Sequence, residues 1–164
     1  MTVKIVNLKV NGVDQAFMAR PETTLLLALR EQLGLTGAKR GCAQGACGSC
    51  TVLVDGAPVV SCLVPAATVD GADVATVEGL ADGPQLSDVQ QAFLDGFATQ
   101  CGFCTPGMIM SAEALLARNP DPTVDEVNEA ISGNVCRCTG YAPIVSAILD
   151  AAQRRRNRVS EEAH

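Results

Sequence analysis

Apolar and polar residues alternate at the start of the chain, as they do in strands with one buried face. Residues 3–10 alternate, and residues 13–18 alternate again after the dipeptide Asn11-Gly12. Asn-Gly between two alternating segments is typical of a two-residue hairpin turn with positive φ at both positions. We therefore expect the two segments to pair as an antiparallel hairpin.

The rest of the first half predicts one helix and further strands. TTLLLALREQL, residues 23–33, has helical spacing, and we expect Thr23 near its N-cap. TVLV and APVVSC lie on either side of Asp55-Gly56 and predict a second hairpin, and residues 73–77 predict another strand. About the first 75 residues are therefore expected to form a small sheet with one helix packed on it.

A segment with Gly and Pro, GLADGPQLS, separates this region from a helical one. Beyond it, capping residues and prolines predict four helices, at residues 87–100, 105–119, 123–132 and 143–154. The Arg-rich residues that follow are polar, and we expect them to fray. The predicted fold is α+β, with a sheet domain at 1–78, a linker at 79–86 and a helical domain at 87–164.

The composition excludes some functions and favours others. The chain has 164 residues, of which 48% are apolar, so it can bury a core. It has no Trp, one Tyr, four Phe and a net charge of −6, which argue against binding single-stranded nucleic acid or a phosphate backbone. No secretory leader and no apolar stretch of bilayer length is visible. We expect a cytoplasmic protein with protein partners and no direct membrane insertion.

The chain has eight cysteines and one histidine. Cytoplasmic thiols are kept reduced, so disulfides are disfavoured. The histidine, His164, is the last residue, and we expect it to lie outside the folded part. Rieske centres and mixed Cys/His zinc sites need histidine ligands within the fold. Any metal site here is therefore expected to be all-thiolate, unless carboxylates contribute.

The first four cysteines have the spacing of a plant-type [2Fe–2S] site, C-x4-C-x2-C with a distant fourth cysteine. They are Cys42, Cys47, Cys50 and Cys62. Three ligands on a short loop wrap the cluster, and a separate strand supplies the last. We expect Gly41, Gly45 and Gly48 to adopt positive φ, so that backbone N–H groups approach the sulfurs and stabilise the anionic cluster.

The other four cysteines form two close pairs that are far apart in the chain. They are Cys101, Cys104, Cys136 and Cys138. Each pair lies in a turn between two predicted helices, so the two turns must meet at one end of the helices to close a site. The positive N-terminal ends of the helices that follow would then face an anionic cluster.

Spacing alone leaves alternatives open. Structural zinc also takes four thiolates, often as two Cys-x2-Cys pairs, and it competes more strongly for the second set than for the first. Disulfides and separate buried cysteines are weaker alternatives, since eight cysteines in two such groups are not chance scatter. The spacing therefore favours a carrier of two [2Fe–2S] clusters, with a zinc-binding interaction module as the non-redox alternative.

Three motifs together resemble one known family. They are GCAQGACGSCTVLVDG with the later SCL, QCGFCTPGMIMSA, and SGNVCRCTGY. They are similar to the iron–sulfur small subunit of the molybdenum hydroxylases, which include xanthine dehydrogenase, aldehyde oxidoreductases, aerobic carbon monoxide dehydrogenase and bacterial N-heterocycle hydroxylases. The resemblance covers residues 3–152 and includes all eight expected cysteines, which removes most of the weight from zinc.

The resemblance implies a ferredoxin-like β-grasp domain followed by a four-helix bundle, with one [2Fe–2S] cluster in each. It implies a large partner subunit that binds molybdopterin and a medium partner subunit that binds FAD, in a dimer of heterotrimers. In such an assembly the helical-domain cluster accepts electrons from the pterin, and the N-terminal cluster passes them to FAD. Gln100 and the sulfur of Cys138 match positions that touch the pterin.

The substrate site lies outside this chain, which shows no acid/base or nucleophile constellation. Carbon monoxide dehydrogenases of the family carry an Asp-Thr-Ser run after the first cysteine, where this chain has Ala43-Gln44-Gly45. The resemblance therefore favours an organic substrate, an aldehyde or an N-heterocycle, over carbon monoxide. The alternative function is a free-standing two-cluster electron carrier, although a simple ferredoxin has no need of the helical domain.

Three further features each have two interpretations. The basic run Arg154–Arg156 with Arg158 either docks on an acidic partner or is a solvated helix end. Phe103 either shields the second cluster from water or is ordinary packing. Tyr141 either donates a hydrogen bond near that cluster or fills the end of the bundle.

Overall fold

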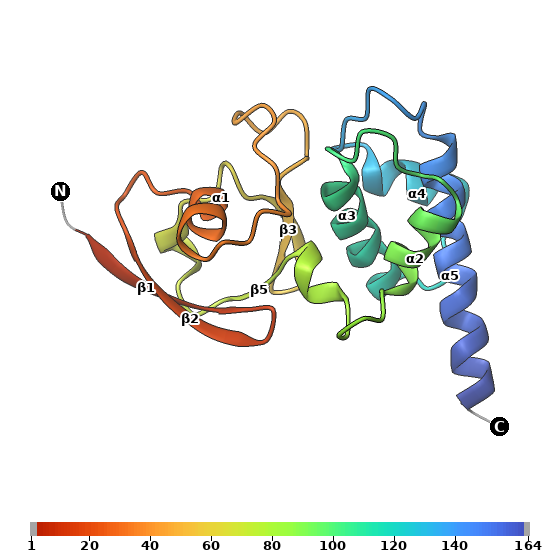
Figure 1. The fold of residues 1–164 in the computed structure, drawn as a ribbon, viewed down its shortest axis with the longest axis horizontal. Coiled ribbons are helices and arrows are strands. Elements are labelled where there is room, and N and C mark those ends of the chain that lie inside the picture. The colour runs from red at the N-terminus through yellow and green to blue at the C-terminus, as the bar shows by residue number, and fades with distance from the viewer. Residues whose placement is uncertain (1–2, 163–164) are drawn as a thin grey trace.

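The computed structural model describes residues 3–162, which form a sheet half and a helical half lying side by side (Figure 1). The arrangement is α+β, as predicted, with all strands in the first half and the longer helices in the second. His164 lies outside the described residues, so the expectation about its place is not tested.

The sheet has five strands in the order β2-β1-β5-β3-β4. Their bounds are Lys4–Val10 (β1), Val13–Ala19 (β2), Thr51–Val54 (β3), Ala57–Val60 (β4) and Asp73–Ala75 (β5). β1 is antiparallel to β2 and parallel to β5, whereas β3 is antiparallel to both of its neighbours. Both predicted hairpins are confirmed, since Asn11-Gly12 and Asp55-Gly56 have positive φ at each turn position.

The predicted helix of this half is present but changes type along its length. α1 spans Leu25–Leu27 and continues as the π-helical η1, Ala28–Gln32. Its N-cap is Thr24, one residue later than predicted, and the Thr24 hydroxyl accepts a hydrogen bond from the amide of Leu27 at 3.2 Å. The hydroxyl of Thr23 accepts instead from an amide of the preceding turn.

Apolar side chains of the sheet and of this helix form the first core. Two 3-10 segments complete this half. η2 (Ala66–Val69) lies between β4 and β5, and η3 (Val77–Leu80) leads from β5 toward the second half. Burial of large aliphatic groups on one face of the sheet is the main stabilising contribution here. Core members with almost no exposed surface include Val6, Leu25, Leu29, Val52 and Val74.

The second half consists of four helices in the described residues. Their bounds are Asp88–Asp95 (α2), Thr105–Arg118 (α3), Val124–Ile131 (α4) and Ala142–Glu162 (α5). The caps predicted at Ser87 and Thr123 are confirmed, and each is a full capping box. α2 ends before Gln100, contrary to the prediction, because Gly96 is followed by Phe97 at a φ of 50°, which no α-helix accommodates.

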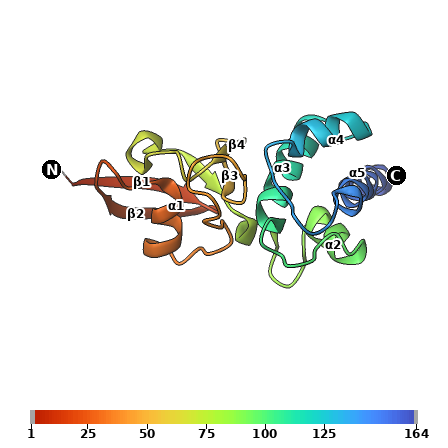
Figure 2. The same cartoon turned by 90° about the horizontal axis from the view of Figure 1, so that it is seen from above.

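α3 packs against elements of both halves. In Figure 2 it lies nearest to the sheet, with α5 on the far side of the helical half. α3 packs against β3 and β4, and its opposite side contributes to a second core. Members of that core with almost no exposed surface include Val89, Phe93, Met108, Val127, Ile144 and Ile148.

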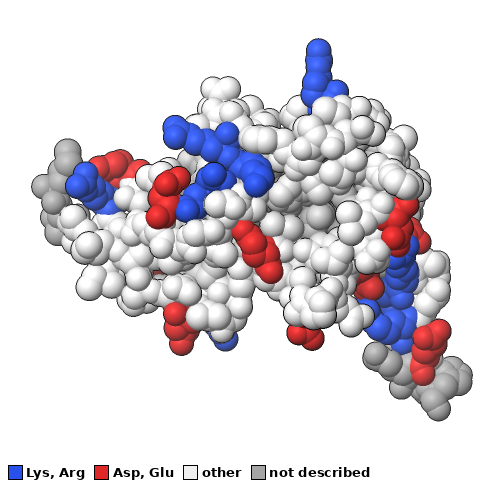
Figure 3. Space-filling view, viewed as in Figure 1, with Lys and Arg blue, Asp and Glu red and all other residues white. Residues whose placement is uncertain are grey.

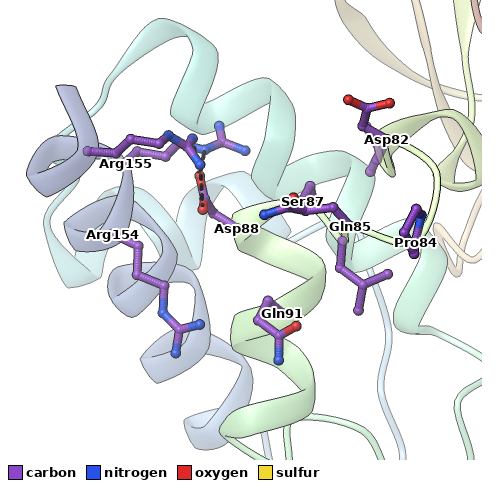
Figure 4. A pocket seen from close by; sticks show the side chains of 11 residues that line it. Asp82, Pro84, Gln85, Ser87, Asp88, Gln91, Arg154 and Arg155 are labelled. Carbon is purple, nitrogen blue, oxygen red and sulfur yellow. Dashed lines mark hydrogen bonds and ion pairs between the residues drawn. The ribbon is translucent and has the colours of Figure 1, made fainter. Parts of the chain in front are cut away.

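α5 is longer than predicted, and the expectation that its Arg-rich end frays is wrong for the described part. Carboxylates of α2, α3 and α5 itself face this basic run, so its charges are neutralised within the chain. The close pairs, at 2.6 to 2.8 Å, are Arg154–Asp95, Arg154–Asp150, Arg155–Glu113, Arg158–Asp88 and, to the segment between α3 and α4, Arg156–Asp121. Figure 4 shows the surface hollow at this place, where Arg155 reaches from α5 to Asp88 at the start of α2.

Charged side chains are distributed unevenly over the face shown in Figure 3. Basic groups gather on the upper part of the sheet half, and acidic and basic groups alternate along α5. The top of the helical half, where the turns before α3 and α5 lie in Figure 1, is almost uncharged apart from one basic projection. Between residues 3 and 162, no helix combines the length and the apolar character needed to cross a bilayer.

Candidate metal centres

Three cysteines of the first group lie on the loop between η1 and β3, beside the junction of the two halves (Figure 1). Arg30 of η1 anchors the start of this loop by donating to the carbonyls of Thr36 and Ala38, both at 2.9 Å. Cys50 directly precedes β3, and Cys62 follows β4, so the β3–β4 hairpin brings these two residues together. Local turn chemistry and one hairpin are therefore enough to gather this group.

The four thiols of the first group contact each other as two pairs, Cys42 with Cys47 and Cys50 with Cys62. The backbone amide of Gln44 points at the sulfur of Cys42, 3.5 Å away, and with two neighbouring amides it lowers the pKa of Cys42 to about 7. The predicted approach of backbone N–H groups to sulfur is thus confirmed at Cys42. Burial instead raises the pKa of Cys50 to about 11.

Two glycines allow this loop to close. A Cβ at Gly41 would lie 2.8 Å from the sulfur of Cys47, so only glycine leaves room for that thiol. Gly48 has a φ of +66°, and a Cβ there would lie 2.3 Å from the carbonyl oxygen of Gly133 in the other half. The predicted positive φ is confirmed for Gly45 and Gly48 but is wrong for Gly41, which is required for its size.

The second group is assembled from two turns, as predicted. One turn joins α2 to α3, and the other joins α4 to α5. The sulfurs of Cys101 and Cys138 are 3.7 Å apart on the surface, and the thiols of Cys104 and Cys136 contact each other in the interior. The group therefore has an exposed pair and a buried pair.

Both thiols of the buried pair have altered pKa values. Burial, reinforced by the thiol of Cys136, raises the pKa of Cys104 to about 12. Burial also acts to raise the pKa of Cys136, but hydrogen bonds from the hydroxyl and amide of Thr139 and from the amide of Cys138 bring it down to about 7. The hydroxyl of Tyr141 donates to the carbonyl of Asn134 at 3.4 Å, so the predicted hydrogen bond near this group is confirmed, and it also accepts from the amide of Cys136 at 2.9 Å.

The donor set fits a dinuclear iron–sulfur centre in each group. All eight cysteines are free thiols, and in a [2Fe–2S] centre with four cysteines each iron takes two thiolates, as the pairs provide. A single zinc would require four sulfurs around one point. Among the described residues, no three or more Cys, His, Asp and Glu side chains converge on such a point. Burial raises the pKa of Cys50 and of Cys104, and a bound cation would lower both again by favouring the thiolate.

Two further residues singled out from the sequence lie beside these groups. Gln100 is exposed and directly precedes the exposed Cys101, outside α2 rather than at its end. Phe103 is 46% exposed, and its ring lies 3.4 Å from the position that a Cβ on Gly41 would occupy. The ring is therefore placed between the two cysteine groups, facing the first loop from the second.

Two hydrogen bonds between the groups were not anticipated from the sequence. The amide of Val135 donates to the carbonyl of Cys47 at 2.9 Å, and the side chain of Asn134 donates to the carbonyl of Gly48 at 3.0 Å. The only signal for them in the sequence was Asn134 within the motif SGNVCRCTGY. Its partner, Gly48, is 86 residues away in the chain.

Comparison with known proteins gives a consistent result for both halves. The model of the 2Fe-2S iron-sulfur cluster binding domain matches residues 8–81, and that of the [2Fe-2S] binding domain matches residues 76–149. Each half of the chain thus matches a domain that binds this type of cluster.

Relatives are similar over nearly their whole length. The chain is 47% identical over 152 residues to the nicotinate dehydrogenase small FeS subunit of Eubacterium barkeri, covering 93% of this chain and 97% of that one. It is 53% identical over 146 residues to the nicotine 6-hydroxylase small subunit of Paenarthrobacter nicotinovorans, covering 89% and 88%. A chain of quinoline 2-oxidoreductase from Pseudomonas putida 86 superposes with a TM-score of 0.91 at 47% identity, covering 96% and 98%. The chain belongs to the iron–sulfur small subunits of the molybdenum hydroxylases, and is thus the iron–sulfur subunit of an oxidoreductase.

Proposed function

We propose that this chain relays electrons from a molybdopterin site on a large subunit to FAD on a medium subunit, during hydroxylation of an organic substrate. The observation that carries the proposal is the placement of two four-thiol groups, each as two pairs, on either side of one junction. Hydroxylation itself is assigned to the large subunit, because residues 3–162 of this chain offer the thiol groups but show no substrate-binding acid/base set.

The eight cysteines are the proposed ligands. Cys42, Cys47, Cys50 and Cys62 would hold one [2Fe–2S] centre, and Cys101, Cys104, Cys136 and Cys138 the other. When bound, each centre supplies a site that takes up and releases one electron at a time. Around them, the amides near Cys42 and the hydroxyl of Thr139 stabilise negative charge on sulfur. Burial of Cys50 and Cys104 keeps water from the inner side of each group.

The second group is the proposed side of electron uptake. Its outer pair, Cys101 and Cys138, is exposed, and Gln100 is exposed next to it. Apart from the exposed Arg137, which stands between Cys136 and Cys138, the surrounding surface is nearly uncharged (Figure 3) and apolar, with Phe97 81% and Val135 52% exposed. Large exposed apolar groups around a functional site are typical of an interface, so this face fits the pterin-binding subunit, with Gln100 and the Cys138 sulfur toward the pterin.

The first group is the proposed side of electron release. Cys62 lines a surface hollow together with Leu27, Arg30 and Arg40. Glu22 and Glu31 line the same hollow, so its two guanidinium and two carboxylate groups beside a thiol suit a partner that presents charges of both signs. We assign this face to the flavin-binding subunit.

The proposed unit boundaries follow the change from sheet to helices. Residues 1–78 would form a ferredoxin-like β-grasp domain, 79–86 a linker and 87–164 a four-helix bundle, with the whole chain in a dimer of heterotrimers. The separate buried cores of the two halves support this division. Eight free thiols suit a reducing compartment such as the cytoplasm, where we place the protein.

The proposed substrate is an N-heterocycle or an aldehyde rather than carbon monoxide. The relatives described above are named for nicotinate, nicotine and quinoline, all of which are N-heterocycles. Ala43-Gln44-Gly45 after the first cysteine agrees with this assignment. The choice among these compounds depends on the pocket of the large subunit.

Mild purification from the native source, followed by identification of the chains that co-purify, tests the proposed function. We expect a large molybdenum-containing chain and a flavin-containing chain in a fixed ratio with this one. Recovery of this chain alone, still carrying iron, would replace the proposal with a free-standing two-cluster carrier. Recovery with zinc in place of iron would replace it with a zinc-binding interaction module.

A further inference from the structure

The junction between the two cysteine groups contains a buried polar side chain, Asn134, which is only 4% exposed. It lies in the turn after α4, two residues before Cys136. Its Nδ2 donates to the carbonyl of Gly48 at 3.0 Å, and its Oδ1 accepts from the hydroxyl of Ser111 on α3 at 2.8 Å. One amide group thus ties the second cysteine turn both to its own helical half and to the first cysteine loop.

The next residue makes a direct link between the two groups. The amide of Val135 donates to the carbonyl of Cys47 at 2.9 Å, and Val135 is bonded to Cys136. The thiol of Cys47 in the first group is therefore connected to the thiol of Cys136 in the second by covalent bonds and one hydrogen bond. Electronic coupling falls off less steeply along bonds and hydrogen bonds than across a van der Waals gap, so this link favours electron exchange between the groups.

The bond from Asn134 is not needed to satisfy the carbonyl of Gly48. That oxygen already accepts from the amide of Thr51 at 3.0 Å and from the Thr51 hydroxyl at 2.7 Å. The additional bond instead holds the turn that carries Val135 against the loop that carries Cys47. The close approach depends on small residues, since a Cβ at Gly107 would lie 2.3 Å from the oxygen of Gly48.

We infer that Asn134 is a positioning residue for electron transfer between the two centres, acting by holding the Val135 amide against the Cys47 carbonyl. The inference rests on the proposed function, because it requires a redox centre in each group. In the step concerned, one electron leaves the reduced centre, which is oxidised, and enters the other, which is reduced. No proton moves and no bond is made or broken at the link.

Two substitutions on either side of the same hydrogen-bonded pair separate this role from general support of the fold. Asn134→Asp keeps an acceptor for Ser111 but removes the donor to Gly48 and sets a carboxylate against a carbonyl. Ser111→Ala removes the bond to Asn134 Oδ1 and leaves the donor to Gly48 in place. Asn134→Asp removes both donor bonds of Nδ2, to the carbonyl of Gly48 and to the hydroxyl of Thr51 at 3.4 Å, so only this change releases the junction.

The experiment uses the intact complex with its centres loaded. Iron content is measured first, then hydrogen exchange in the segment containing Val135, and then the rate at which one injected electron equilibrates between the two centres. For Asn134→Asp we expect full iron content, exchange of the Val135 amide that is about tenfold faster, as loss of a hydrogen bond of about 1.5 kcal/mol allows, and slower equilibration. For Ser111→Ala we expect both quantities to stay near those of the unmodified protein.

Two results would overturn the inference. One is Asn134→Asp with unchanged exchange and unchanged equilibration, and the other is an equal slowing in both variants, which is the behaviour of a merely structural pair. If Asn134→Asp loses iron, Asn134→Ala, which removes the donor to Gly48 and the acceptor for Ser111 without adding charge, is held to the same two expectations, with Ser111→Ala as the control for the lost Ser111 bond. Absence of iron–sulfur centres from the unmodified complex is a different result, because it contradicts the proposed function itself.

Discussion

The two cysteine groups have similar chemistry but are built in different ways. In the first, three thiols come from one short loop, and a single hairpin delivers Cys62. In the second, the turns that carry Cys101 and Cys138 are brought together only by the packing of α2, α3, α4 and α5. The first group is thus determined mainly by local structure, whereas the second depends on the tertiary structure of a whole domain.

This difference leads to an asymmetric expectation. Changes in helix packing far from any thiol should weaken the second group and leave the first intact. Changes in the first loop should stay local unless they touch the junction with the second half. The predictions that follow test this asymmetry, starting with the largest effect.

Removing one thiol from each group gives the largest expected effect. Cys104→Ser and Cys50→Ser should each lower the iron content from about four to about two per chain, with loss of one of two [2Fe–2S] signals. The lost signal should differ between the two variants, and metal analysis with low-temperature EPR measures both effects. If either substitution abolishes both signals in a chain that still folds, the assignment of ligands to two separate centres is wrong.

The junction is tested by a pair of glycines that both have positive φ. A Cβ at Gly48 would collide with the carbonyl of Gly133, whereas a Cβ at Gly56 meets nothing within 4 Å. We expect Gly56→Ala to lower the free energy of unfolding by about 1 kcal/mol, from backbone strain alone. Gly48→Ala should lower it by roughly 2–4 kcal/mol, because strain and overpacking add. Equal losses of unfolding free energy in denaturant titrations would show that the two halves are not tightly packed against each other at Gly48.

The ion pairs of α5 test whether the second group depends on distant packing. Arg155 pairs with Glu113 at 2.6 Å, and their side chains are 23% and 12% exposed. Arg155→Met leaves that carboxylate partly buried without its cation, so we expect a loss of about 1–2 kcal/mol. In a chelator challenge followed by absorption, the second centre should be lost earlier than in the unmodified protein. Lys9→Met, at an exposed position on β1, is the control, and equal sensitivity of both centres to Arg155→Met would contradict the asymmetry.

The capping box of α4 has the smallest expected effect. Thr123→Ala removes the cap and should cost about 1 kcal/mol. Hydrogen bonds from the amide and hydroxyl of Thr123 lower the pKa of Glu126, so this carboxylate stabilises the fold above its unfolded-state pKa. That contribution is lost as the pH falls through the lowered pKa.

Urea titrations of the unmodified chain and of Glu126→Gln, repeated from neutral to acidic pH, measure this effect. We expect the difference in stability between them to shrink as the pH falls. A difference that stays constant or grows on acidification would show that the Glu126 carboxylate does not act through its charge.

The features that could be predicted from the sequence are the ones with local causes. Both hairpins rest on turn dipeptides, and the caps at Ser87 and Thr123 rest on residues within one helical turn. The loop of the first group was predictable for the same reason, since its thiols are close in sequence. Even there, the positive φ predicted for Gly41 was wrong. Gly41 is needed for the space that it leaves for Cys47, and a sequence pattern does not show that space.

The features that were missed depend on partners distant in sequence. α5 continues past Arg154 because carboxylates of α2 and α3 face its basic residues, which no local signal shows. α2 stops early at a left-handed Phe97, a conformation that bulky residues seldom adopt. The bond from Asn134 to Gly48 joins two motifs that had each been recognised, but their contact follows only from how α3 packs on the sheet.

The central claim is that this chain holds two [2Fe–2S] centres, each on two thiol pairs. Iron and zinc analysis of the purified complex, combined with EPR after reduction, tests it most directly. The account predicts about four iron atoms in this chain and two distinguishable [2Fe–2S] signals. A colourless chain with about two zinc atoms, no iron and no signal on reduction would contradict it.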